Sequence, residues 1–426
     1  MPANPPLIAI VFWGLVTFSL LVVIHEGGHF AAARAFGVRV REFMLGLPGP
    51  SIGFTSKRTG VRYGVTAIPL GGYVRIAGME PGEEDELLGP ALKAAAAIGT
   101  IDVDSLAEIL LVPVDRAAAI LRTLEDWGSV ETAAGSPDRY HAVVTADETT
   151  DPAELLATER RATYRGLPTW KRLTVLAMGV VMNLVTAVLI ATVTLAVFGY
   201  PQPTLTLASV VKGSPAARAG MAAGDRLAAL DGKAVKDWQQ MFDRIQAARP
   251  GTVHSVTFVH AGRTATAIVT FAAAPQTKKA FLGVGPTIET VRPSVIDALG
   301  QSLSWIGLVF VAVVQFFNPS TFAASVAGAR SVVGISVETA RAASEGVLPY
   351  VQIVALLSLS LGVINILPIP PLDGGKIAME IIEKVIRRPI PRSITLGISV
   401  TGALLLFSLI GYLMYADVVR YVAGHG

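Results

Sequence analysis

The sequence His25-Glu26-Gly27-Gly28-His29 directly follows Leu7–Ile24, a run that contains no charged residue. The pattern H-E-x-x-H puts two imidazoles one helical turn apart on one face, at the spacing that a zinc ion needs, with a carboxylate beside them. An uncharged run of this length is typical of a membrane helix. The stretch therefore predicts a hydrolytic metal site in a membrane helix, although a bilayer excludes the water that hydrolysis consumes.

The composition of the whole chain also indicates a membrane protein with some soluble mass. Of its 426 residues, 52% are hydrophobic and 16% are charged, whereas soluble domains carry about 25% charged residues. Mean hydropathy is +0.55. The net charge of +3 is too small to favour a nucleic-acid partner. Because the chain has no cysteine, it has neither disulfides nor thiolate metal ligands.

Four uncharged runs are long enough to cross about 30 Å of hydrocarbon. They are Leu7–Ile24 continuing to Ala33, Leu173–Phe198, Gly346–Leu372 and Ser393–Ala416. A fifth apolar run, Ala298–Ala329, is ambiguous, because Asn318-Pro319 breaks it and several polar residues lie within it. The sequence therefore predicts four transmembrane helices and one apolar segment of another kind.

Basic residues next to these runs predict the topology. They gather at positions 34–62, 171–172 and 387–392, and the positive-inside rule places all three groups in the cytoplasm. Both termini and the region 200–345 are then extracytoplasmic. If the fifth run also crossed, Asp373 would lie on the wrong side of the membrane to meet the two histidines. That run is therefore predicted to lie at the outer interface.

Two cytoplasmic pieces are expected between the first two membrane helices. In residues 43–79, β-forming residues alternate with Gly and Pro, which predicts a membrane-associated bent β-hairpin or small sheet, followed by the acidic stretch 80–86. Residues 87–150 show two helical segments joined near Val112-Pro113 and then a two-stranded wing, which is a winged-helix pattern. This insert has no basic face, so a packing or interaction module is favoured over DNA binding.

Residues 201–290 form a soluble α/β segment. Ala208-Ser-Val-Val-Lys-Gly-Ser-Pro, Gly220-Met, Ala223-Gly-Asp-Arg-Leu and Trp238 resemble the PDZ domains of bacterial envelope proteases. The resemblance implies that extended peptide ends bind by adding a strand to a sheet edge. A folded spacer that only controls access is the alternative.

The predicted fold class is an α-helical membrane protein whose four transmembrane helices carry a β-hairpin, a winged-helix-like insert and one PDZ domain. In chain order, the predicted segments are the first membrane helix with the metal motif (1–42), the β-hairpin region (43–86), the insert (87–150), a linker and second membrane helix (151–200), the PDZ domain (201–290), interfacial helices (291–345), the third membrane helix with a cytoplasmic loop (346–392) and the fourth membrane helix (393–426).

A zinc site that keeps one position open for water needs a third protein ligand. Asp373 is the best candidate, because it ends the third apolar run and an ionisable group at such a boundary indicates function. Pro368, Pro370 and Pro371 break that helix just before Asp373, which a membrane tolerates where the backbone lines protein or a wet cavity. The alternative is that Asp373 caps the helix that begins near Gly374.

The residues also suggest catalytic roles. Glu26, next to His25, can reach a water molecule at the metal, take its proton and pass it to the leaving amine. Asn365 lies eight residues before Asp373 and can donate a hydrogen bond to a developing oxyanion.

Together these motifs resemble the bacterial site-2 proteases, in the group of the regulator-of-sigma-E protease. The motifs that carry the resemblance are His25-Glu-Gly-Gly-His29, Gly71-Gly72-Tyr73-Val-Arg, the PDZ segment and Asn365-x-x-Pro-x-x-x-x-Asp373-Gly-Gly. The resemblance implies that His25, His29 and Asp373 bind Zn2+ and that Glu26 is the general base. It further implies that Asn365 orients the substrate or stabilises the oxyanion. The hairpin with Gly71, Gly72 and Tyr73 would pair with the substrate, and the PDZ domain would exclude intact substrates.

The chain departs from the family pattern in several places. Gly27 stands where the family often has a bulky apolar residue. The family's G-P-x-x-N pattern appears as Gly179-Val-Val-Met-Asn183, without the proline. Asn183 is therefore expected either beside the site or in an ordinary helix–helix contact. One PDZ domain replaces the usual two, and the insertion at 87–160 is extra.

The expected function is an intramembrane zinc endopeptidase in the inner membrane of a bacterium. Its expected partners are the lipid bilayer, single-span membrane proteins such as anti-sigma factors or remnant signal peptides, and peptide ends at the PDZ domain. A non-catalytic scaffold or chaperone with the same fold is an alternative, although the presence of Glu26 disfavours it. A metal transporter is a third hypothesis, but it would need several intramembrane acids or histidines along a path.

Overall fold

The structure is a computed structural model that describes residues 5–69, 71–79, 84–133, 135–147, 149–274, 277–388 and 390–422. Residues 80–83 of the predicted acidic stretch lie outside this part. The chain divides into two compact units, Met1–Ala191 with Leu299–Gly426, and Thr192–Ala298. Each unit is described by itself.

Five helices in the described ranges are long and apolar enough to cross a membrane, judged by length and composition. They are α1 (Leu7–Ala35), α6 (Thr169–Phe198), α9 (Val295–Gln315), α12 (Val347–Ile366) and α14 (Arg392–Val422). Four of them coincide with the four predicted spans, and α9 lies in the ambiguous fifth run. Because α9 also meets the criterion, the predicted count of four spans stays a prediction.

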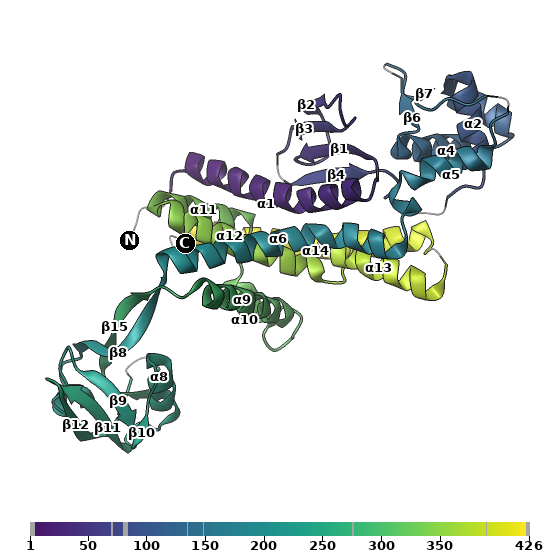
Figure 1. The fold of residues 1–426 in the computed structure, drawn as a ribbon. Coiled ribbons are helices and arrows are strands. Elements are labelled where there is room, and N and C mark those ends of the chain that lie inside the picture. Colours follow the sequence, from purple (N-terminus) through teal and green to yellow (C-terminus); the bar gives the residue numbers. More distant parts are fainter. Residues whose placement is uncertain are drawn as a thin grey trace. The chain divides into compact units, whose positions relative to one another are not determined.

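Glycines let the long helices of the first unit approach closely. A Cβ atom at Gly28 on α1 would lie 2.2 Å from the carbonyl oxygen of Met178 on α6. Likewise, a Cβ atom at Gly362 on α12 would lie 2.8 Å from the Leu184 side chain on α6. Around Leu184, Leu359 of α12 packs with apolar residues of α6 and α9. Figure 1 shows α6 and α12 running side by side.

Three further helices complete the C-terminal half of this unit: α10 (Phe322–Gly328), α11 (Val332–Glu345) and α13 (Asp373–Ile386). The helix α11 packs along the first half of α1, where Ile10 contacts Val337 and Ala340. In contrast, α13 starts directly after the proline-rich turn that ends α12.

The segment after α1 forms a mixed four-stranded sheet with the strand order β2-β3-β1-β4. Its strands are β1 (Val40–Leu45), β2 (Ser51–Thr55), β3 (Arg62–Thr66) and β4 (Gly72–Ile76). The bent hairpin or small sheet expected over residues 43–79 is this four-stranded sheet, in which β2 and β3 form an antiparallel hairpin. Strand β1 lies between β3 and β4, parallel to β3 and antiparallel to β4. The edge strand β4 packs on α1, since a Cβ atom at Gly72 would lie 2.7 Å from Val22 Cγ1.

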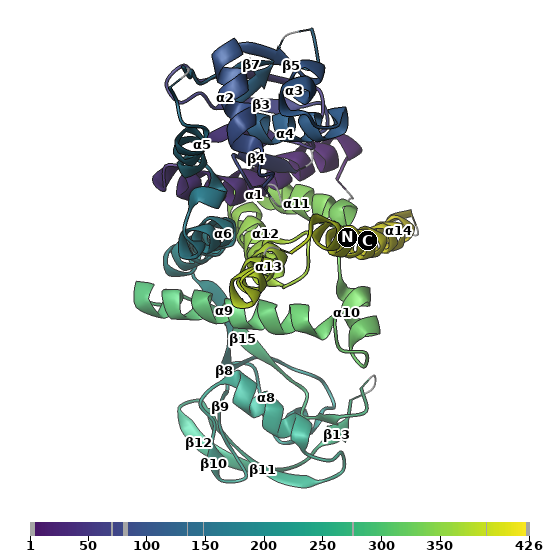
Figure 2. The same ribbon diagram turned by 90° about the vertical axis from the view of Figure 1, so that its right-hand side faces the viewer.

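The insert contains the two helices and the two-stranded wing that its sequence predicts, together with one more helix and one more strand. Its elements are α2 (Leu88–Ile98), β5 (Thr100–Asp102), α3 (Val103–Leu110), α4 (Val114–Trp127), β6 (Val130–Thr132) and β7 (Arg139–Ala142). The strand order is β5-β7-β6, and the core contains Leu92, Leu106, Leu121 and Trp127. Figure 2 shows the insert and the four-stranded sheet on the same side of α1. A linker with α5 (Pro152–Arg161) and the short helix η1 (Tyr164–Gly166) leads into α6.

The second unit is an α/β segment with a six-stranded sheet of order β12-β11-β9-β8-β15, to which β10 pairs at β9, and a separate two-stranded sheet of β13 and β14. Its strands are β8 (Tyr200–Val210), β9 (Arg226–Leu230), β10 (Lys233–Ala234), β11 (Val253–His260), β12 (Arg263–Thr270), β13 (Ala272–Ala273), β14 (Ala280–Phe281) and β15 (Val284–Val291). Its helices are α7 (Pro215–Arg218) and α8 (Trp238–Ala247). The core contains Leu207, Leu227, Met241, Val256 and Phe271.

Candidate metal centre

His25 and His29 on α1 meet Asp373 of α13, although 344 residues separate His29 from Asp373 in the chain. Asp373 Oδ2 lies 2.9 Å from His25 Nε2 and 3.1 Å from His29 Nε2. The two Nε2 atoms are 3.3 Å apart. All three side chains are buried, and they form a group that could hold a metal ion.

These distances fit a tetrahedral zinc site. Zinc binds imidazole nitrogen and carboxylate oxygen at about 2.0–2.2 Å, so two ligand atoms of a tetrahedral site lie roughly 3.3 Å apart. The three observed separations, 2.9, 3.1 and 3.3 Å, are close to this value. Two histidines and one carboxylate leave the fourth position open, as catalytic zinc sites do.

A backbone hydrogen bond orients His29. Its Nδ1 lies 2.8 Å from the carbonyl oxygen of Val175 on α6. A carbonyl oxygen only accepts, so Nδ1 carries the proton and donates it. The lone pair is therefore on Nε2, the atom that faces Asp373, and this tautomer is the one that binds a metal.

Asn183 on α6 plays the corresponding part for His25. Its Nδ2 lies 3.2 Å from His25 Nδ1, whereas its buried Oδ1 has no hydrogen-bond partner within the described ranges. The oxygen and nitrogen of such an amide are assigned from the hydrogen-bond network. Exchanging them satisfies Oδ1, which then accepts from the Nδ1–H of His25. The exchange also leaves the lone pair of His25 on Nε2. The Asn183 backbone is held by Ser358 of α12, whose hydroxyl donates to the Asn183 carbonyl oxygen at 2.9 Å.

Asp373 is the first residue of α13, and Leu372 occupies the capping position. The carboxylate contacts the imidazoles and the ammonium of Lys376, whose Nζ lies 3.4 Å from Oδ1. The two glycines that follow explain the rest of the motif. A Cβ atom at Gly374 would lie 2.2 Å from the Ile366 carbonyl oxygen, and one at Gly375 would lie 2.3 Å from the Pro370 nitrogen. The turn before α13 is thus too tight for side chains at these positions.

The other predicted site residues lie around this centre in different ways. Glu26 is half-buried on α1 and interacts electrostatically with both histidines and with Lys376. Asn365 is buried near the end of α12, and its amide donates to the Leu361 carbonyl oxygen of the same helix at 3.0 Å. An oxyanion contact would therefore require this amide to leave its intrahelical bond.

Gly71, Gly72 and Tyr73 lie at the start of the edge strand β4 and in the turn before it. Tyr73 Oη donates to Glu42 Oε2 at 3.2 Å. Partial burial and the neighbouring Glu42 carboxylate raise the pKa of the Tyr73 hydroxyl, so the hydroxyl stays protonated and remains a donor. This bond holds β4 to β1.

A cavity of about 400 Å³ lies between β4 and the start of α13. Val74 and Ile76 of β4 line one part of it, and Pro370, Pro371 and Lys376 line another. The cavity therefore joins a sheet edge to the turn that carries Asp373.

Gly179 belongs to the site. In the sequence, it was noted only as the first residue of the family's G-P-x-x-N pattern and was not predicted as a site residue. A Cβ atom at Gly179 would lie 2.3 Å from His29 Nε2 and 2.9 Å from His25 Cε1. The helix α6 can thus pass directly over both imidazoles only because this residue has no side chain.

Replacing Gly179 by Ala is expected to displace both imidazoles and to lower the zinc content of the purified protein at least tenfold. The cause would be the steric clash of the added methyl group with the imidazoles. Helix propensity works in the opposite direction, because alanine favours a helix over glycine by about 1 kcal/mol. Gly27→Ala is the matched control, since a Cβ atom there meets no described atom within 4 Å. Metal analysis of both variants checks this prediction, and equal zinc contents would contradict it.

Known bacterial proteins are similar to this chain along nearly its whole length. The model of Peptidase family M50 matches residues 13–409. Three bacterial relatives, each named "Putative zinc metalloprotease", align over nearly their whole lengths. The Streptococcus pyogenes serotype M3 protein is 27% identical over 95% of this chain and 98% of its own. The Lactococcus lactis protein is 26% identical over 95% and 97%, and the Neisseria meningitidis protein 28% identical over 94% and 97%. Among solved structures, the PDZ domain of an SdrC-like protein from Listeria monocytogenes matches with 24% identity and a TM-score of 0.19, over 21% of this chain and 90% of that chain.

Proposed function

Because the chain belongs to peptidase family M50 and is a multi-pass zinc metalloprotease of the site-2 type, we propose that it cleaves single-span membrane proteins within or near their transmembrane segments. The observation that carries this proposal is the buried His25–His29–Asp373 cluster on helices long and apolar enough to span a bilayer. His25, His29 and Asp373 hold the zinc ion. A peptide bond hydrolysed at this cluster lies beside the start of α13, at the end of an apolar helix.

When bound, zinc polarises the scissile carbonyl and makes a water molecule nucleophilic near neutral pH. Glu26 takes the proton of that water and then transfers it to the nitrogen of the leaving amine, so the residue ends each cycle in its starting form. Lys376, which interacts with both Glu26 and Asp373, adds positive charge beside the two carboxylates. Asn365 donates to the oxyanion after it exchanges its bond to Leu361 for one to the substrate.

Asn183 is a positioning residue in this proposal, because it sets the tautomer and the ring orientation of His25. Asn183→Ala is expected to raise the zinc dissociation constant about 10- to 100-fold, the usual cost of losing a partner of a metal-bound histidine. Asn183→Asp is the matched variant, since its carboxylate still accepts from Nδ1–H and should largely restore affinity. Competition with a chromophoric zinc chelator measures both constants. Wild-type affinity in Asn183→Ala would reduce Asn183 to a helix–helix contact.

The substrate enters in an extended form along β4. A helix keeps its amides in internal hydrogen bonds, so cleavage needs local unwinding, and pairing with a sheet edge replaces the lost bonds. The strand β4 is at the edge of its sheet, packs on the helix that bears His25, and borders the cavity that reaches Pro370. Gly71, Gly72 and Tyr73 lie where this pairing would begin.

The proposed setting is the inner membrane of a bacterium, with both termini and the Thr192–Ala298 unit extracytoplasmic and the insert cytoplasmic. Basic clusters at 34–62, 171–172 and 387–392 support this orientation. The PDZ-like sequence of the second unit supports peptide-end binding and exclusion of intact substrates there. Anti-sigma factors and remnant signal peptides are the proposed substrate classes in regulated intramembrane proteolysis.

The experiment that tests the function compares membrane proteomes of cells that carry the wild-type protein or the Glu26→Gln variant. Single-span proteins, or their membrane-embedded remnants, are expected to accumulate in the variant. A scaffold or chaperone would give the same proteome with either form, and that result would overturn the proposal.

A further inference from the structure

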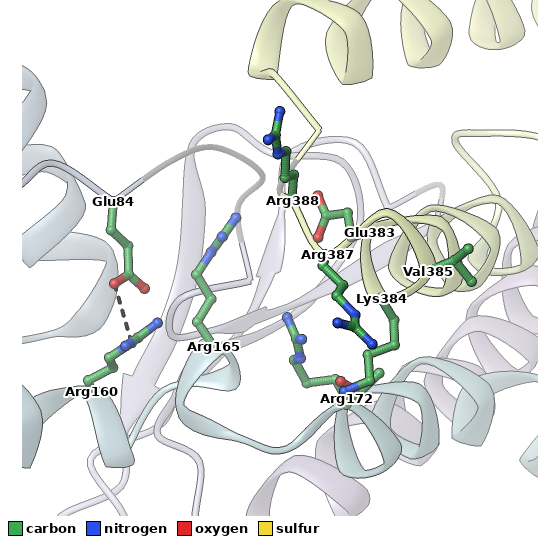
Figure 3. Close-up of a pocket in the computed structure, with 10 residues that line it drawn as sticks. Glu84, Arg160, Arg165, Arg172, Glu383, Lys384, Val385, Arg387 and Arg388 are labelled. Carbon is green, nitrogen blue, oxygen red and sulfur yellow. Dashed lines mark ion pairs between the residues drawn. The ribbon is translucent and has the colours of Figure 1, made fainter.

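A second cavity, of about 1,040 Å³, has no residue of the metal centre in its lining, shares Arg165 and Glu383 with the smaller cavity, and is lined mainly by basic side chains. Six basic and two acidic side chains line it, so their formal net charge is +4. They are Arg160, Arg165, Arg172, Lys384, Arg387 and Arg388 with Glu84 and Glu383. We call this cavity the basic pocket. In Figure 3, Arg160 and Arg165 line one part of it, and Lys384 and Arg387 line the opposite part.

Each acidic residue of the basic pocket has a partner through one carboxylate oxygen, although the buried Oε1 of Glu84 has none within the described residues. Glu84 Oε2 pairs with Arg160 Nε at 3.2 Å. Glu383 Oε1 accepts from the backbone nitrogen of Ile390 at 2.9 Å and so holds the turn after α13. Within the described residues, neither carboxylate forms an ion pair with Lys384, Arg387 or Arg388, so the positive charge of these three side chains is not neutralised by the pocket's own acidic residues.

Arg172 is only partly compensated. Its Nη1 lies 3.2 Å from Glu380 Oε2, and Glu380 also accepts from Tyr164 Oη at 3.1 Å. Burial raises the pKa of Glu380 despite the opposing effect of Arg172. In addition, the buried Nε of Arg172 has no hydrogen-bond partner in the part of the chain that the structure describes. An anion in the basic pocket would satisfy this donor.

The position of the basic pocket in the chain points to the ligand. Thr169 and Arg172 belong to the first turn of α6, directly before the uncharged run that starts at Leu173. Lys384 and Arg387 lie at the end of α13, a few residues before α14. The basic pocket thus borders the polar ends of two apolar helices, at the depth where a bilayer presents its headgroups.

We propose that the basic pocket binds a phosphate-bearing anion, the headgroup of an anionic phospholipid. Guanidinium groups bind phosphate through two parallel hydrogen bonds, and five arginines line this one cavity. The positive-inside rule explains basic residues near these helices, but it requires no convergence on a single cavity. Binding of an anionic headgroup would explain why basic side chains from α5, α6 and α13 meet in one cavity.

Binding here would act on the metal centre through the helices. The helix α6 holds His29 through Val175, and α13 begins with Asp373. Arg172 on α6 already pairs with Glu380 of α13, and Lys384 and Arg387 add uncompensated positive charge at the other end of the same helix. A phosphate held by Arg172 together with Lys384 or Arg387 would add a second link between the two helices.

The test uses the intact protein in a non-ionic detergent and measures thermal unfolding and ligand dissociation constants, neither of which depends on peptidase activity. The probes are dihexanoyl phosphatidylglycerol, dihexanoyl phosphatidylcholine and inorganic phosphate. Phosphatidylglycerol at about 100 times its dissociation constant is expected to raise the unfolding midpoint by on the order of 4 °C. The zwitterionic phosphatidylcholine should raise the midpoint much less.

The variant Arg165→Gln with Arg387→Gln removes one guanidinium from each side of the basic pocket. It should weaken phosphatidylglycerol binding at least about tenfold. The charge-matched control is Lys57→Gln with Arg58→Gln, two exposed residues between β2 and β3, and it should bind as the wild type does. If inorganic phosphate gives the same dissociation constant as phosphatidylglycerol, the phosphate site stands and its source is a soluble anion. Equal binding by all three proteins, or equal loss in both variants, would overturn the proposal.

Discussion

Replacing Glu26 by Gln is expected to slow cleavage of a single-span substrate about 1,000-fold while zinc stays bound. General acid–base catalysis contributes about 10²- to 10⁴-fold to such reactions, and glutamine has nearly the same shape but cannot take a proton. The zinc ion should remain, because His25, His29 and Asp373 form the metal-binding group without Glu26. The purified variant should therefore differ from the wild type in turnover and not in metal content.

The measurement is the single-turnover cleavage rate of a tagged single-span substrate in reconstituted vesicles, with zinc determined on the same sample. Gly27→Ala is a suitable control on the same helix, because its added methyl group meets no described atom within 4 Å. It should retain most of the wild-type rate. Undiminished cleavage by Glu26→Gln with zinc bound would place the catalytic base elsewhere.

Replacing Asp373 by Ala is expected to raise the zinc dissociation constant more than about 100-fold. Loss of a partner outside the ligand shell already costs about 10- to 100-fold, and Asp373 is proposed as one of three direct ligands. The change also removes the only carboxylate that contacts both imidazoles within the described residues. Activity should fall together with the zinc content and return in part at high zinc concentration.

Asp115→Ala is the matched control for this experiment, because Asp115 also lies in the first turn of a helix, α4, and has no contact with the metal centre. Both substitutions remove an acidic residue from a helix N-terminus, where it is worth about 0.3–1 kcal/mol. Only Asp373→Ala should release zinc. If both variants kept zinc equally well, Asp373 would only stabilise the N-terminus of α13 and would not be a zinc ligand.

Local patterns were sufficient for the elements with a strong period or composition. The apolar runs predicted the positions of α1, α6, α12 and α14 to within a few residues, because a span needs about 20 apolar residues in succession. The spacing of His25 and His29 predicted two imidazoles on one face, because four residues make about one helical turn. Asp373 was predictable as their partner, since an ionisable residue at the end of an apolar helix is rare without a function.

Strand pairing and the basic pocket depend on long-range packing, which these local patterns do not predict. Strand β1 pairs with both β3 and β4, and no alternation within residues 40–45 encodes that position. In the same way, the basic pocket brings together arginines from residues 160–172 and 387–388. In the sequence alone, basic residues near the apolar runs indicated only the topology.

By itself, then, the sequence determined the long apolar helices, the residue types of the proposed metal ligands and the family to which their spacing belongs, because each depends on neighbours within a turn or a span. The tertiary structure alone decided that Gly179 must lack a side chain, that Asn183 faces His25, and that the donors of His25, His29 and Asp373 lie 2.9–3.3 Å apart. The first two properties depend on how α6 crosses α1, whereas the distances to Asp373 depend on where α13 begins beside α1. A crossing is set by contacts between residues about 150 positions apart, which no local pattern in either helix specifies.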